Sequence, residues 1–320
     1  MKKTSKIMSL VLAGAMVLSM TACAGNTAET TSAAAKTQET AADTASKAEE
    51  TTGAEASESE TAAKAEGTTY KIGVLQLVQH TALDAANDGF IAALDDAGIA
   101  YEVDQQNASG DQSACQTVAS KFANEKKDLI LAIATPAAQA MVGAVEDTPV
   151  LITAVTDPAE SGLVDTNEKP GANVTGTSDL TPVKEQIDLL KQLVPEAKTV
   201  GVLYCSAESN SKIQADMVKE AIAAAGMESK EYTVSSSNEI QTVVQSMVGA
   251  VDAVYAPTDN VIAAGMATVG MVAGDNNLPV ICGEAGMVQN GGLATYGIDY
   301  YQLGYMTGQQ AVKILTEGAS

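Results

Sequence analysis

From Thr68 onward, short runs of β-branched and other apolar residues alternate with longer segments of helical period. The run 71–78 predicts a buried strand. The segment 81–98 predicts a helix, because apolar residues such as Leu83 and Phe90 recur at helical spacing before Gly98. The same alternation predicts further strands at 101–106, 128–134 and 149–155, and helices near 111–126 and 136–145.

The alternation then restarts in the second half of the chain. It predicts strands at 173–178, 198–204, 228–234, 252–257, 279–283 and 293–299. It predicts helices near 181–194, 208–225, 238–248, 260–274 and 301–316. Strands that alternate with helices form βαβ units and parallel sheets. Since these are too many strands for one small sheet, we expect an α/β protein with two Rossmann-like domains.

The first 23 residues follow a different pattern. A cationic start, MKKTSK, precedes an apolar run that is short for a membrane-spanning helix and ends in Met20-Thr21-Ala22-Cys23. This resembles a bacterial lipoprotein signal, although Met20 stands where that pattern more often has Leu. We therefore expect residues 1–23 to be a signal peptide and Cys23 to carry the lipid. An ordinary secretory signal with an incidental cysteine is the alternative.

Residues 24–67 are almost entirely Ala, Thr, Ser, Glu and Lys, without any aromatic residue. Such a segment cannot bury enough apolar surface to offset the entropy lost on ordering. The composition predicts a disordered acidic tether between the signal and the folded body.

Composition excludes several classes of function. The formal net charge is −22, and all 18 cationic residues are Lys. An acidic chain without Arg is poorly suited to a phosphate backbone, so we expect no nucleic-acid partner. A single histidine, His80, and the lack of a CxxC pair predict no metal site, and no cofactor is expected. Cys115, Cys205 and Cys282 are interpreted as buried small residues outside any disulfide framework.

Ligands of open parallel sheets bind beyond the carboxyl ends of the strands. Nearly every predicted strand end carries hydrogen-bonding groups. We take as candidate ligand-binding residues Gln79, His80, Thr135, Ala137, Asp157, Ser178, Asp179, Tyr204, Glu208, Asn210, Ser211, Asp259, Asn260, Glu284 and Asp299. Tyr204 and Tyr300 stand nearest to strand ends among the tyrosines. Asp, Ser, Thr and Asn at such positions are also ordinary helix N-caps, so each has a structural alternative.

Signatures of catalysis are missing from the sequence. It contains no GxGxxG after a strand, no Walker lysine motif and no GxSxG elbow. His80 has no Ser or Cys beside it in a recognisable arrangement. The candidate groups therefore favour binding, and we expect no enzyme; a secreted doubly wound enzyme is the weaker alternative.

Seven blocks, in order, resemble the substrate-binding lipoproteins of an ABC-transporter family similar to tryptophan- and tyrosine-binding proteins. They are VLQLVQHTALDAANDGF, ATPAAQA, TAVTDPAESGLV, NVTGTSD, GVLYCSAESNS, YAPTDN and GGLATYGIDYYQLG. The resemblance implies the periplasmic-binding-protein type I architecture, with lobe 1 at 68–172 plus 284–320 and lobe 2 at 173–283. Family members commonly continue past the last helix, so it also implies that a third crossover is truncated here.

The same resemblance implies a receptor that closes on a small zwitterionic solute and delivers it to a membrane permease. An aromatic or other apolar amino acid is the expected ligand, and a sugar, nucleoside or purine is the alternative. Without Arg, a ligand carboxylate would be held by backbone N–H groups and hydroxyls at helix N-termini. Asp157, Asp259 and Glu284 are available for the ammonium. We expect a lipid-anchored monomer on the extracytoplasmic face of the cell membrane.

Overall fold

The computed structural model describes residues 67–319. The expected signal peptide with Cys23 and nearly all of the expected tether lie outside these residues. Among residues 67–319, no helix has the length and apolar character that crossing a membrane requires.

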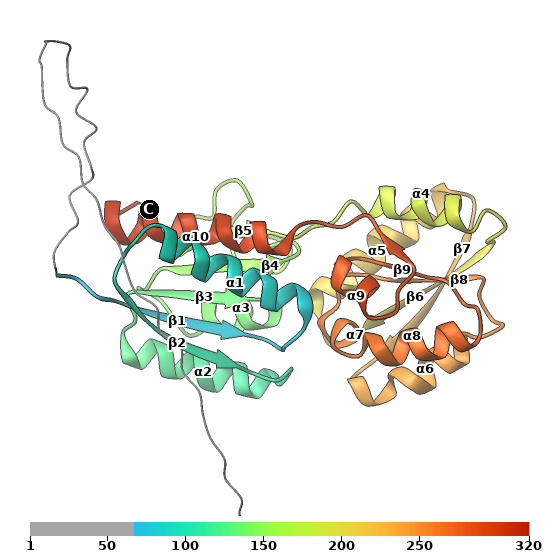
Figure 1. Cartoon of the computed structure of the whole chain (residues 1–320), viewed down its shortest axis with the longest axis horizontal. Helices are drawn as coiled ribbons and strands as arrows, with labels where there is room; N and C mark the ends of the chain where they lie inside the picture. The colour runs from blue at the N-terminus through green and yellow to red at the C-terminus, as the bar shows by residue number, and fades with distance from the viewer. Residues whose placement is uncertain (1–66, 320) are drawn as a thin grey trace, which may run out of the picture. The chain divides into compact units, whose positions relative to one another are not determined.

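The first half of the described chain forms a five-stranded parallel sheet in the order β2-β1-β3-β4-β5 (Figure 1). Its strands are β1 (Tyr70–Gln76), β2 (Tyr101–Asn107), β3 (Leu129–Ile133), β4 (Val150–Val155) and β5 (Val174–Ser178). Strands β3 and β4 are buried along their whole length, as expected for a parallel sheet covered on both faces. We call this sheet, with the helices that cover it, lobe 1.

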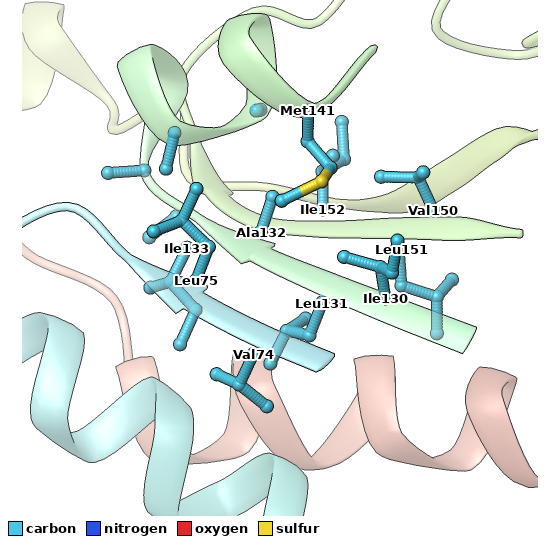
Figure 2. Close-up of a cluster of buried hydrophobic side chains, with 14 of the residues drawn as sticks. Val74, Leu75, Ile130, Leu131, Ala132, Ile133, Met141, Val150, Leu151 and Ile152 are labelled. Carbon is cyan, nitrogen blue, oxygen red and sulfur yellow. The ribbon is translucent and has the colours of Figure 1, made fainter. Parts of the chain in front are cut away.

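Helices cover both faces of the sheet in lobe 1. One face carries α1 (Thr81–Asp96) and α10 (Tyr300–Glu317), and the other carries α2 (Gln112–Glu125) and α3 (Thr135–Val142) (Figure 1). Figure 2 shows the core between β1, β3, β4 and α3, where Leu75, Ile133 and Met141 are fully buried. Helices α1 and α10 can approach closely because Gly89 and Gly304 have no side chain. A Cβ at either position would collide with the backbone of the other helix.

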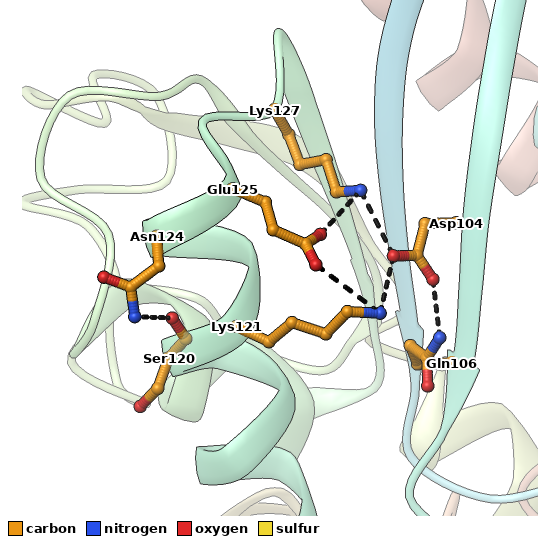
Figure 3. A network of polar contacts seen from close by, with 7 residues as sticks. All are labelled: Asp104, Gln106, Ser120, Lys121, Asn124, Glu125 and Lys127. Carbon is orange, nitrogen blue, oxygen red and sulfur yellow. Dashed lines mark hydrogen bonds and ion pairs between the residues drawn. The ribbon is translucent and has the colours of Figure 1, made fainter.

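A polar network fixes α2 to the edge strand β2 (Figure 3). Lys121 Nζ lies 2.7 Å and Lys127 Nζ 3.2 Å from Asp104 Oδ2, and Lys127 also pairs with Glu125 at 2.9 Å. Both ammonium groups lie over the ring of the buried Phe122. Charges at this edge leave β2 less open to pairing with another strand.

The second half forms another five-stranded parallel sheet, in the order β10-β9-β8-β6-β7. Its strands are β6 (Thr199–Cys205), β7 (Glu228–Val234), β8 (Ala253–Ala256), β9 (Val280–Cys282) and β10 (Ala294–Thr295). Its helices are α4 (Val183–Leu193), α5 (Ser209–Ala224), the 3₁₀ turn η1 (Ser237–Glu239), α6 (Ile240–Met247), α7 (Asn260–Ala264), α8 (Met266–Asp275) and α9 (Ala285–Gln289). We call this part lobe 2.

The alternation along β6 explains how lobe 2 is layered. Val200, Val202 and Tyr204 pack with α4 and α5 on one face. Leu203 and Cys205 pack with α6, α7 and α8 on the other. Successive side chains of a strand point to opposite faces, so one buried strand serves two helical layers.

The α/β class and the two parallel sheets are confirmed, with three corrections of detail. The expected lobe boundaries, 68–172 plus 284–320 and 173–283, placed β5 in lobe 2 and β10 in lobe 1. However, β5 pairs with β4, and β10 pairs with β9. The chain therefore changes lobes after β5 and after β10. Hydrophobic pattern identifies a strand but does not say which sheet it joins.

The other corrections concern helices. The single helix expected at 260–274 is divided at Gly265, where the Cβ of any other residue would meet Ile240 Cδ1. The short helix α9 was not expected, because five residues are too few to show a period. Cys115, Cys205 and Cys282 are buried and free, as predicted.

Candidate functional site

Strand ends of both lobes meet around one narrow cavity, which we call the polar slot. It is lined by His80, Ala82, Leu83, Ala154, Thr156, Asp179, Asn210, Thr258, Asp259, Asn260, Ala263, Glu284 and Tyr300. Its volume is about 10 Å³, close to the room that one water molecule needs. The lining contains carboxylates but neither Lys nor Arg.

Helix α1 directs its N-terminus toward the polar slot. Its N-cap residue is His80, whose side chain makes no capping bond, and Ala82 and Leu83 of the first turn line the cavity. The first N–H groups of a helix have no partner within it and carry partial positive charge. This end of the slot therefore favours an anion.

His80 also joins the two lobes. Its Nε2 lies 3.2 Å from Asn260 Oδ1, while Nδ1 has no hydrogen-bond partner in the described part of the chain. Burial lowers the pKa of the His80 ring, with the bond to Asn260 as an opposing effect. The ring is therefore neutral near pH 7 and supplies no counter-charge to the carboxylates.

Asp179, which directly follows β5, offers a free acceptor to the slot. Its Oδ2 accepts a hydrogen bond of 2.8 Å from the Tyr300 hydroxyl. Its Oδ1 is buried without a partner among residues 67–319. Burial raises the pKa of Asp179 to about 6, against the lowering effects of the Tyr300 and Thr156 side chains. An unpaired carboxylate oxygen in such surroundings favours a cation.

Asp259 and Glu284 serve mainly as helix caps. Asp259 Oδ1 accepts from the Ile262 N–H at 2.8 Å, and its Oδ2 accepts from the Cys205 N–H at 2.5 Å. Glu284 accepts from the N–H groups of Gly286 and Met287 at the start of α9. Burial is the first cause that raises the pKa of each carboxyl group. The structural alternative noted for these strand-end acids therefore applies to both.

Glu208 is the centre of a buried network in lobe 2. Its Oε2 accepts from Asn210 Nδ2 at 3.0 Å and from Asn260 Nδ2 at 2.7 Å. Burial, followed by the nearby charge of Asp259, raises the pKa of Glu208 to about 7. The network orients Asn260, whose Oδ1 faces His80.

A wider cavity of about 530 Å³, the outer cleft, adjoins the slot at Asn260, which lines both. Glu208, Pro136 and Val261 also line it, together with serines from the loops after β2 and β7. The outer cleft has a mixed lining of apolar and hydroxyl groups, and it extends the space between the lobes beyond the slot.

Two alanines at strand ends have a positive φ. Ala134, after β3, has φ 83°, and Ala154, within the irregular end of β4, has φ 54°. Such φ values are unfavourable for residues other than glycine and recur at functional sites. Ala154 lines the slot, so the strain coincides with the cavity.

The structure brings together only some of the residues expected to bind a ligand. The slot gathers His80, Asp179, Asn210, Asp259, Asn260 and Glu284, and Glu208 lines the outer cleft. The candidates outside both linings are Gln79, Thr135, Ala137, Asp157, Ser178, Tyr204, Ser211 and Asp299.

Local contacts account for the positions of several candidates outside both linings. Tyr204 lies beneath α4 and α5, and its hydroxyl donates to Glu231 at 2.8 Å. Asp157 binds the Glu160 N–H and Asn167 within a turn. Asp299 is exposed and caps α10 through the Gln302 N–H.

The remaining candidates outside both linings lie in three places. Thr135 and Ala137 are buried in the first turn of α3, on either side of Pro136, and the Thr135 hydroxyl has no partner in the described residues. Ser178 donates to the Thr156 carbonyl, and Ser211 is fully buried. Gln79 is exposed and faces a separate polar hollow beside β2.

The set of candidate residues lacks the polar slot residues Thr156, Thr258 and Tyr300, and it also lacks slot residues without distinctive chemistry. Ala82, Leu83, Ala154 and Ala263 line the cavity as small apolar residues. Nothing in the sequence separates them from alanines and leucines of the core. Gln214, which donates to the slot residues Thr156 and Thr258, lies within α5, so the strand-end rule could not identify it.

Comparison with known proteins identifies the family. A family model described as "ABC transporter substrate binding protein" matches residues 71–320. The chain belongs to this family. A tyrosine-binding protein of Clostridioides difficile (strain R20291) is 42% identical across 100% of this chain and 86% of its own length.

Two solved structures of relatives differ in how well they match the described fold. A protein in complex with L-Trp from Streptococcus pneumonia has 40% identity and a TM-score of 0.77. A ligand-free, open substrate-binding protein with adhesive properties from Clostridium difficile has 49% identity and a TM-score of 0.60. Each comparison covers 79% of this chain and 86% of the other. The L-Trp complex therefore superposes better on the described fold than the more identical, ligand-free protein does. The periplasmic-binding-protein type I architecture is confirmed.

Proposed function

We propose that this protein is the extracytoplasmic receptor of an ABC importer and that it binds an aromatic amino acid in the polar slot. The observation that carries the proposal is the buried Asp179 carboxylate, which lines a cavity without Lys or Arg and whose Oδ1 has no partner among the described residues. An α-ammonium group supplies the missing counter-charge. Relatives that bind tyrosine and L-Trp support an aromatic side chain.

The ligand carboxylate has a matching position at the other end of the slot. The first turn of α1 offers N–H groups beside the neutral His80, and the chain has no Arg that could take this role. A helix N-terminus is a ready anion site. In this proposal Asp179 binds the ammonium, the α1 N-terminus binds the carboxylate, and Asn210 Oδ1 accepts a further hydrogen bond.

The two cavities together provide room for an amino acid. Ala82, Ala154 and Ala263 line the slot and project little into it. The slot has space for about one water molecule, so it takes the ammonium group, and the aromatic side chain extends into the adjoining outer cleft of about 530 Å³. The lobes separate to admit the ligand. Binding then shifts the population toward the closed arrangement, which the permease recognises.

Residues outside the described structure complete the proposal. Cys23 carries a lipid that anchors the monomeric protein to the outer face of the cell membrane, and residues 24–67 act as the tether. The protein captures its ligand without chemical turnover.

Isothermal titration calorimetry on the full chain tests the ligand assignment. L-tryptophan and L-tyrosine are the probes, with tryptamine lacking the carboxylate and indole-3-propionate lacking the ammonium. We expect one or both amino acids to bind, and each analogue to bind at least about a hundredfold more weakly, because a buried polar group is left unpaired. Failure of both amino acids to bind, or equal binding of an analogue, would contradict the proposal.

A further inference from the structure

Gln214 is hydrogen-bonded to two residues that line the polar slot, one from each lobe. It belongs to α5 and is fully buried. Its Nε2 donates to Thr156 Oγ1 at 3.1 Å and also to Thr258 Oγ1. Its Oε1 accepts from the Thr258 N–H at 3.2 Å. Both threonines line the slot.

These hydrogen bonds differ in whether they cross the cleft. Thr258 follows β8 in lobe 2, the lobe that contains Gln214, so those contacts persist when the lobes move apart. Thr156 follows β4 in lobe 1, so its contact must break. The Thr258 N–H fixes the amide so that Nε2 points at Thr156. The side chain is therefore oriented in advance for a partner that arrives on closure.

We propose that Gln214 is a closure latch, a positioning residue that stabilises the closed lobes and sets the width of the slot. The inference rests on the proposed function, since it assumes that closure traps an aromatic amino acid. The latch acts without touching the ligand, by holding the strand ends of β4 and β8 on either side of it.

A second glutamine provides a matched control. Gln139 of α3 also reaches across the cleft, with Nε2 3.2 Å from Ser209 Oγ. This contact is exposed, so water replaces it when the lobes separate. The Gln214–Thr156 contact is buried, so losing one partner removes a hydrogen bond that water does not replace in the closed form, while Gln214 keeps its contacts with Thr258. Only the buried contact should affect the closing equilibrium strongly.

A double-mutant cycle on the full chain tests the latch, with L-tryptophan and L-tyrosine as probes. We expect Gln214→Leu and Thr156→Val each to raise Kd about tenfold, chiefly through faster dissociation. The double variant should also weaken binding about tenfold instead of a hundredfold, because both partners of one contact are gone. That corresponds to a coupling of about 1.4 kcal/mol. Gln139→Ala should change Kd less than twofold.

Additive effects in the cycle, or an unchanged Kd in Gln214→Leu, would overturn the latch. If Gln214→Leu fails to fold by circular dichroism, Thr156→Ser and Thr156→Val decide instead: the hydroxyl-bearing variant should keep its affinity and the valine variant should lose it. Small-angle scattering without ligand adds a separate readout, in which Thr156→Val should give a larger radius of gyration than wild type. Wild type that binds neither amino acid would overturn the ligand assignment, and the scattering result would still decide the latch.

Discussion

The two lobes each place a buried aspartate within three residues of the end of a strand, and the two side chains have different partners. In lobe 2, both carboxylate oxygens of Asp259 accept backbone N–H groups, from Ile262 and Cys205. In lobe 1, one oxygen of Asp179 accepts from the Tyr300 hydroxyl, and the other has no partner within residues 67–319. Both side chains are almost completely buried. A strand-end acid is therefore a structural element where N–H groups surround it, and it is available for the binding role that we propose for Asp179 where they do not.

Replacing the structural aspartate should have the largest effect. Asp259→Ala leaves two backbone N–H groups unsatisfied, which destabilises the folded state. Removing the repulsion between Asp259 and Glu208 offsets only part of that loss of stability. We expect the free energy of unfolding to fall by about 2–4 kcal/mol in urea denaturation. Asp299→Ala removes an exposed cap and should cost about 1 kcal/mol. Equal losses in the two variants would show that burial of the cap does not matter.

Replacing the binding aspartate should affect affinity more than stability. Asp179→Asn keeps the shape of the side chain and its contact with Tyr300 but removes the charge that the ammonium needs. We expect the Kd for L-tryptophan to rise about a hundredfold, or about 2.7 kcal/mol, with no decrease in the ligand-free thermal midpoint. Asp157→Asn, in a turn beyond β4, is the control and should leave Kd unchanged. A Kd within threefold of wild type in Asp179→Asn would remove Asp179 from the site.

The smallest expected effect is a change with pH, in which stability and ligand affinity should move in opposite directions. Burial raises the pKa of Asp179 to about 6, and burial with the charge of Asp259 raises that of Glu208 to about 7. The folded-state pKa values of both carboxyl groups exceed those of the unfolded chain. Protonation of the two groups therefore stabilises the folded state at low pH, and this stabilisation is lost as pH rises through 6 to 7.

Ligand affinity should change with pH in the opposite direction, since only ionised Asp179 pairs with the ammonium. From pH 7 to pH 5, Kd should rise about tenfold while the ligand-free thermal midpoint increases. Calorimetry and thermal unfolding across this range measure both quantities, and Asp179→Asn should flatten the affinity profile. A Kd that falls on acidification would assign the ammonium to another group.

Much of the fold follows from local pattern. Buried runs such as 128–134 and 149–155 became β3 and β4 because a parallel strand covered on both faces must be apolar throughout. The expected boundaries failed at β5 and β10, where a few residues carry no information about the sheet that they join. The rule that polar groups collect at strand ends selected His80, Asp179 and Asn260, which line the polar slot. It gave equal weight to Asp157, whose partners lie in its own turn.

The sequence by itself determined the α/β class, the alternation that builds two parallel sheets, the absence of Arg and the family. These properties depend on composition and on periods of a few residues. Only the tertiary structure decided which carboxylate keeps a free oxygen and which residues of lobe 1 meet lobe 2. The pairing of Gln214 with Thr156 joins residues that are 58 positions apart in the chain. Their contact depends on how the lobes pack, and no local pattern encodes that.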